Sequence, residues 1–151
     1  RQVVASPDPL KIVEAESIRA VVDAGIIPVC CGGGGVPVIR DSSTGLYTGA
    51  QAVIDKDLCA AILARETGAE LLVIATDVDG VYTDWGTPQQ RRIDHAKPSD
   101  LERSQFADGS MGPKVRAACR FVRRTGQRAV IGSLEDIGDI VAGRAGTLIE
   151  P

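Results

Sequence analysis

The chain has 151 residues, a formal net charge of −3 and only 3% aromatic residues. This length is typical of one domain, and the negative charge provides no bulk attraction to nucleic acid. No apolar run approaches the roughly 18 residues that a membrane-spanning helix needs, so we expect neither nucleic acid nor a membrane as a partner. The core must be built from small aliphatic side chains, which suits a parallel sheet covered by helices.

The first half of the chain alternates apolar and polar segments with clear stop signals. Gly25 and Gly68 each follow a helical pattern, as glycine does at helix ends. The strands are recognised as short, continuous apolar runs. In chain order the pattern predicts a helix, a strand, an extended piece, a polar loop, a helix and a strand, over residues 14–24, 26–31, 37–39, 41–49, 56–67 and 71–76.

The second half begins with an irregular excursion and then returns to alternation. We expect that excursion, a short helix, a longer helix, a strand, a helix capped by Ser133 and a last strand over residues 84–97, 98–105, 113–125, 128–131, 133–143 and 147–149. The longer helix has an apolar face made of Val115, Ala118, Cys119 and Val122. Its other face carries Arg116, Arg120, Arg123 and Arg124, which we interpret as exposed to solvent and not as a binding patch. Alternation of strands and helices predicts an α/β fold with a largely parallel sheet.

Four cysteines occur, at Cys30, Cys31, Cys59 and Cys119. None forms a CxxC pair, and together with the single histidine they match no zinc-site spacing. We expect small buried thiols in a reducing compartment, and no metal held by protein ligands alone.

The segment AVIDKD places a lysine where a helix should begin. Asp55 suits the helix cap, and Asp57 suits the positive end of the helix dipole. Lys56 is disfavoured there, by up to about 1 kcal/mol, unless an anion offsets its charge. The alternatives are an ordinary helix start and a phosphate site, in which Asp57 would hold lysine ammonium groups in place.

The segment GSMGPK repeats this arrangement at a second helix start. Lys114 follows Pro113, and Gly109 and Gly112 let the backbone approach a ligand closely. Helix amino-termini also present free N–H groups to anions. A solvated lysine after a flexible loop is the alternative to a phosphate contact.

Two further turns lie where ligands bind in α/β proteins. Asp77, Asp79 and Gly80 follow the clearest strand, and ligands of open sheets lie at the carboxyl ends of strands; the alternative is a plain Asp-Gly turn. The glycine run, Gly32, Gly33, Gly34 and Gly35, could approach a small substrate or a phosphate, or be only a flexible turn.

Most of the chain resembles carbamate kinases, which are members of the amino acid kinase family. The resemblance rests above all on the IDKD and SMGPK motifs in that order and separation. The matching stretches are RQVVASPDP, CCGGGGVPVIR, AVIDKDLCA, GAELLVIATDVDGVYTDWG, GSMGPKVRAACRFV and RAVIGSLED.

This resemblance implies a three-layer αβα sandwich with a mostly parallel sheet. It implies phosphoryl transfer between carbamoyl phosphate and ADP, giving ATP and carbamate, with Mg²⁺, in a cytoplasmic homodimer of arginine metabolism. Lys56, Asp57 and Lys114 would be the catalytic residues. The nucleotide pocket would be lined by Thr76, Asp77, Val78, Tyr82, Met111 and Gly112, and Gly32 to Gly35 would lie on the active-site side.

Members of this family are about twice as long and carry a Gly-Gly-Asn phosphate loop in their amino-terminal half. The chain begins at Arg1, and its only methionine is Met111. We therefore expect residues 1–151 to be a single nucleotide-binding domain, the carboxyl-terminal part of a longer kinase, which binds ADP or ATP weakly and turns over little.

Two other functions stay open at this point. One is a nucleotide-binding module of the same family without catalysis. The other is a phosphatase of the haloacid dehalogenase type, because VIATDVDGVY contains a strand followed by DxDG; Asp77 would then be its covalent nucleophile.

Overall fold

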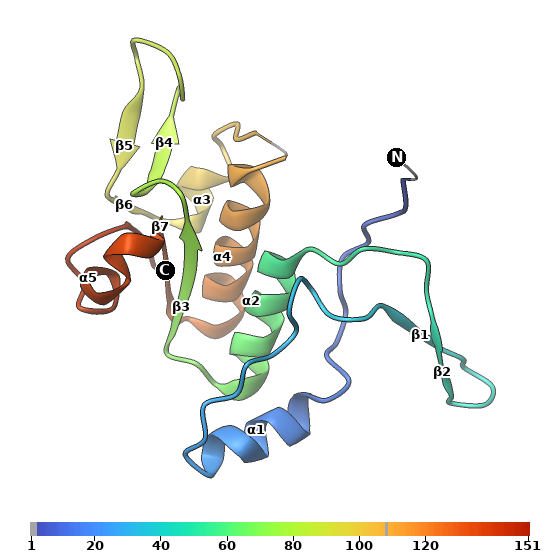
Figure 1. Ribbon diagram of the computed structural model, residues 1–151. Helices are drawn as coiled ribbons and strands as arrows, with labels where there is room; N and C mark the ends of the chain where they lie inside the picture. Colours follow the sequence, from blue (N-terminus) through green and yellow to red (C-terminus); the bar gives the residue numbers. More distant parts are fainter. Residues whose placement is uncertain (1–2, 108) are drawn as a thin grey trace.

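The computed structural model describes residues 3–107 and 109–151, and Figure 1 shows its arrangement. The helices are α1 (Ala15–Asp23), α2 (Lys56–Thr67), α3 (Pro98–Leu101), α4 (Met111–Thr125) and α5 (Ile137–Val141), with a 3₁₀ turn η1 (Leu134–Asp136) before α5. The strands are β1 (Val38–Arg40), β2 (Tyr47–Gly49), β3 (Leu71–Thr76), β4 (Val81–Thr83), β5 (Arg91–Ile93), β6 (His95–Ala96), β7 (Arg128–Ser133) and β8 (Thr147–Ile149).

The central sheet has the strand order β3-β7-β8-β6. Strands β3 and β7 run parallel in a register that pairs Leu71 with Arg128 and Thr76 with Ser133. Strand β8 is antiparallel to β7, and β6 is parallel to β8. Two of these three pairings are parallel, which confirms the expected mostly parallel α/β sheet.

Helices cover both faces of this sheet. Helices α2 and α4 pack against one another and against β3, while α5 packs on β7 and β3 from the other side (Figure 1). Helix α1 lies outside α2. This arrangement is the expected three-layer αβα sandwich. No helix in the described part of the chain is long and apolar enough to cross a membrane.

Local signals explain why α2 and α4 are well defined. The Asp55 side chain accepts hydrogen bonds from the backbone N–H groups of Asp57 and Leu58, both at 2.9 Å, and so caps α2. Gly68 and Gly126 end the two helices in the left-handed conformation, which glycine adopts at little cost. The predicted inward face of α4 is confirmed, because Val115, Ala118, Cys119 and Val122 are all buried.

The strand expected over residues 26–31 is wrong. No strand forms there, and the side chains of Ile27 and Val29 are almost completely exposed, at 92% for Ile27. An apolar run becomes a strand only when a neighbouring strand takes its hydrogen bonds, and none of the described strands pairs with it.

The remaining differences concern short elements. The loop at 41–49 ends in β2, which forms a hairpin with β1, and the irregular excursion at 84–97 contains β5 and β6. The helix expected over 98–105 ends at Leu101, and the helix expected from Pro113 already begins at Met111. Strands β2, β5 and β6 have only two or three residues each and contain no long apolar run, so their sequence patterns are too short to predict a strand.

Candidate active site

The first turn of α2 holds a nearly buried carboxylate. Asp57 lies at the second position of the helix, and its side chain is only 9% exposed. A buried carboxylate needs charged or hydrogen-bonding partners, since burying it alone would be very costly. Its position near the positive end of the helix dipole also favours the negative charge.

Two lysines meet at one oxygen of this carboxylate. The Lys114 ammonium lies 3.1 Å from Asp57 Oδ2, and the Lys56 ammonium lies 3.6 Å from the same oxygen. The Lys114 side chain is 12% exposed, whereas that of Lys56 is 60% exposed. The two motifs therefore bring both lysine ammonium groups to the same carboxylate oxygen. Lys114 is nearly buried there, whereas Lys56 is open to solvent.

The topology of the sheet explains this convergence. Helix α2 leads into β3 and α4 leads into β7, and these two strands are parallel. Both helices therefore run opposite to their strands, and their amino-termini lie at the edge of the sheet where β3 and β7 end (Figure 1). This edge is the usual ligand-binding edge of an α/β sheet.

The glycine run is positioned against the start of α2. Gly34 is buried, has φ +130°, and a Cβ at that position would collide with the carbonyl oxygen of Ile54. Only glycine fits there, because both the conformation and the close approach exclude a side chain. Gly34 therefore lies next to Ile54, the first residue of the IDKD motif.

The amide groups of this run are partly engaged within it. The N–H of Gly32 donates to the Cys30 carbonyl, and those of Gly34 and Gly35 donate to the Cys31 carbonyl. In this conformation these three donors are not directed at a ligand, so a phosphate bound through them would require the loop to rearrange.

The turn after β3 has its own hydrogen bonds. The Thr76 hydroxyl donates to Asp77 Oδ1 at 3.0 Å, and the Tyr82 hydroxyl donates to Asp79 Oδ1 at 2.8 Å. The hydrogen bond to Asp79 raises the pKa of Tyr82 above its usual value. Arg92 also lies 3.2 Å from Asp79. Asp77 itself is exposed at the carboxyl end of the strand.

The expected nucleotide residues come from the end of β3 and the turn after it, from β4 and from the start of α4. Val78 is half-buried in the turn after β3, and Met111 packs partly buried against the main core at the start of α4. A Cβ on Gly112 would lie 3.0 Å from the Ala107 carbonyl oxygen, so this glycine permits a tight turn into α4. Within the described residues no group of three or more His, Cys, Asp or Glu side chains could hold a metal ion.

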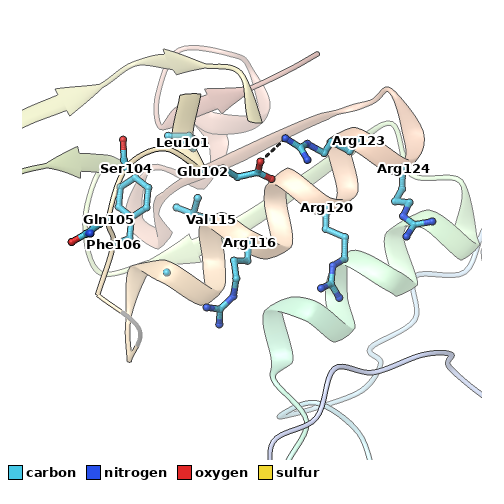
Figure 2. Close-up of a pocket in the computed structure, with 11 residues that line it drawn as sticks. Leu101, Glu102, Ser104, Gln105, Phe106, Val115, Arg116, Arg120, Arg123 and Arg124 are labelled. Atoms are coloured by element: carbon cyan, nitrogen blue, oxygen red, sulfur yellow. Dashed lines mark hydrogen bonds and ion pairs between the residues drawn. The ribbon is translucent and has the colours of Figure 1, made fainter. Parts of the chain in front are cut away.

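Sequence reasoning missed one concave feature. A groove of about 670 Å³ lies on the outer face of α4 and includes the arginines that we had interpreted as merely exposed (Figure 2). Its other wall is the segment after Leu101, which the sequence predicted to be helical. A cluster of four arginines in nine residues was the available signal.

The chain is similar to known proteins over almost its whole length. The chain is 50% identical to the carbamate kinase of Haemophilus influenzae and 52% identical to that of Escherichia coli K12, each over 149 residues. Both matches cover 99% of this chain and 48% of the relative, so the chain spans about half the length of these curated relatives. The structure of carbamate kinase from Giardia lamblia bound to AMP-PNP superposes with a TM-score of 0.93 at 39% identity, covering 98% of this chain and 53% of that one.

The model of the amino acid kinase family matches residues 2–133, which include the glycine run, both lysine motifs and the turn after β3. On that match, and with carbamate kinases as relatives along its whole length, the chain belongs to the amino acid kinase family.

Proposed function

We propose that this chain is the nucleotide- and phosphate-binding half of a carbamate kinase, which transfers a phosphoryl group between carbamoyl phosphate and ADP to give ATP and carbamate. The observation that carries the proposal is the meeting of Lys56 and Lys114 at Asp57 Oδ2. It is supported by relatives that are named carbamate kinases.

In phosphoryl transfer the protein does little covalent chemistry itself. It mainly positions the substrates and stabilises the negative charge of the transferred phosphoryl group. In the direction of ATP synthesis, an oxygen of the ADP β-phosphate attacks the phosphorus of carbamoyl phosphate. The bond between phosphorus and the carbamoyl oxygen breaks, and carbamate leaves with that electron pair. Negative charge is spread over the phosphoryl oxygens during transfer, and Lys56 and Lys114 are placed to balance it.

The two lysines would act differently because their burial differs. Lys114 is held by the buried Asp57 and would present a fixed charge at the amino end of α4. Lys56 has an exposed side chain that can move from Asp57 to an incoming phosphate. Asp57 is the positioning group that sets where both ammonium groups lie.

The nucleotide would bind along the same edge of the sheet. Thr76, Asp77, Val78 and Tyr82 follow or end β3, and Met111 and Gly112 begin α4. Since no three-ligand group is present in the described part of the chain, Mg²⁺ would bind mainly to the nucleotide phosphates, whose charge it neutralises. The cytoplasmic location and the homodimer stay predictions.

Titration of the whole chain with ADP, with carbamoyl phosphate and with both, combined with detection of ATP, tests the proposal. We expect weak ADP binding, little turnover, and weaker binding of the phosphate-bearing ligands when Lys114 is replaced in Lys114→Met. Lys97→Met, an exposed lysine before α3, is the matched control and should bind like the parent. Equal binding by the parent and Lys114→Met would contradict the proposed site.

The alternative is a nucleotide-binding module of the same family without catalysis, which would bind ADP but gain nothing from carbamoyl phosphate. The phosphatase function is disfavoured, because the second aspartate of DxDG, Asp79, is already bound by Tyr82 and Arg92, and the relatives are named carbamate kinases.

A further inference from the structure

The groove on the outer face of α4 has the size and floor of a small-molecule site. It lies between α4 and residues 101–106, and its volume is about 670 Å³, within the roughly 300–1,000 Å³ typical of ligand pockets. Leu101, Phe106 and Val115 provide apolar surface; Leu101 and Val115 are buried and Phe106 packs against the core. An apolar floor can cover the uncharged body of a ligand.

The rim of this groove is strongly basic. Among the described residues that line it, four are arginines and one, Glu102, carries a carboxylate; Asp8, beside the groove, pairs with Arg120. These arginines are Arg116, Arg120, Arg123 and Arg124. The whole chain carries a net charge of −3, so this concentration of positive charge contrasts with the rest of the molecule. A concave surface lined by one sign of charge raises the local concentration of oppositely charged ligands.

Three of the arginines form a regular row. Arg116, Arg120 and Arg124 are spaced four residues apart, which places them on one face of α4 at steps of about 6 Å along its axis. Figure 2 shows their side chains projecting to the same side of the helix. Guanidinium groups bind phosphate and carboxylate in bidentate fashion, so the row can hold two anionic groups about one helical turn apart.

Three of the four arginines already have partners: Arg120 and Arg123 are in ion pairs, and Arg116 makes an interaction of its own. Arg120 lies 2.6 Å from Asp8, and Arg123 pairs with Glu102 across the groove. The side chain of Arg120 is 39% exposed and that of Arg123 is 53% exposed. Exposed ion pairs are weak, so a ligand with several charges can displace the carboxylates.

We propose that this groove binds a small molecule that carries at least two phosphate or carboxylate groups on an apolar body. The groove adjoins the candidate active site at Gly112, which lines it and also belongs to the expected nucleotide pocket. Neither lysine of that site nor Asp57 lines the groove, and the Lys114 amine is directed at Asp57, away from it. A long nucleic acid is a poorer fit, since the row spans only about 12 Å and the chain as a whole is negative. The proposal does not depend on the kinase activity.

NMR titration of the whole chain with inorganic tripolyphosphate tests the anionic part of this site. Dissociation constants are read separately from the backbone amides of residues 115–124 and of residues 55–58. We expect the groove amides to shift, and the double variant Arg116→Gln/Arg124→Gln to weaken binding at the groove by about tenfold or more, since two charge-assisted contacts are lost. Binding should also weaken as salt is raised.

The matched control is Arg19→Gln/Arg144→Gln, which removes the same charge from two exposed arginines outside the groove. It should leave the groove constant within about twofold, as expected for distant and independent sites. Equal weakening by both double variants would show a bulk charge effect and overturn the proposal. Shifts confined to residues 55–58 would also overturn it, because the anion would then occupy only the phosphoryl site.

Discussion

Replacing Lys114 by methionine tests whether Asp57 depends on the buried lysine. Lys114→Met keeps the length and apolar stem of the side chain but leaves Asp57 without its partner at 3.1 Å. Removing one partner of a buried ion pair costs roughly 3–5 kcal/mol, because the other charge stays buried. Lys56 can offset part of this loss, but its pair is exposed and such pairs contribute roughly 0–1 kcal/mol. We therefore expect Lys114→Met to lower the free energy of unfolding by about 2–4 kcal/mol.

Urea unfolding followed by circular dichroism measures this loss. With a slope of about 2 kcal/mol per molar urea, the midpoint should fall by about 1–2 M. The Lys97→Met variant changes an exposed lysine in the same way and should leave the midpoint nearly unchanged.

The double variant Asp57→Asn/Lys114→Met gives the sharper result. It removes both charges, so the cost of an unpaired buried carboxylate disappears. We expect it to be more stable than Lys114→Met alone by about 1 kcal/mol or more, even though the neutral amide gives up the small helix-dipole contribution of the carboxylate. A double variant whose destabilisation equals the sum of the two single variants would refute the inference that these two charges depend on each other.

Three further predictions follow from local geometry. Gly34→Ala should destabilise the loop beside α2 and weaken phosphate binding, whereas Gly33→Ala, where an added Cβ meets nothing within 4 Å, should be tolerated; equal unfolding midpoints in urea would contradict this. Burial raises the pKa of Cys59 to about 12 and of Cys119 to about 11. Both thiols should therefore be alkylated far more slowly in the folded chain than in urea at pH 8.5. Because their folded pKa values exceed the unfolded value, the stability that these thiols contribute is complete below about pH 9 and is lost as pH rises toward 11–12. Hydrogen bonds from Ser43 and Thr44 hold the pKa of the Asp41 carboxyl well below its usual range, so its NMR titration should lie below that of a free aspartate, and a midpoint near 3.8 would show that the turn is open in solution.

The elements predicted with the correct bounds have either a clear hydrophobic run in the sequence or residues that mark their ends. Helix α2 and strand β3 have the bounds expected from the sequence, because Asp55 and Gly68 mark the helix ends and β3 is an uninterrupted apolar run. The sequence pattern predicts the start of α4 two residues too late, because glycine and proline at positions 112 and 113 resemble a turn. Proline is nevertheless compatible with the first helical turn, where its missing N–H group would have no hydrogen-bond partner.

The segment over residues 26–31 shows the limit of such reasoning. Its composition favours a buried strand, but burial is a property of the surroundings and not of the segment. The same limit applies at the site. The sequence indicated that Lys56, Asp57 and Lys114 belong together, but only the fold shows that Lys114 is enclosed and Lys56 is not.

The difference in exposure between Lys56 and Lys114 favours the proposed phosphate site over a purely structural ion pair. A structural pair needs one cation for one carboxylate, and Lys114 alone meets that need at 3.1 Å. A second lysine at the same oxygen, placed at a helix start where its charge is unfavourable, adds repulsion between two ammonium groups and little stability. A buried ion pair is itself weak evidence of stabilisation. The surplus positive charge at the open side of Asp57 is accounted for when an anion binds between the two lysines, and the phosphoryl group that the proposed reaction moves is such an anion.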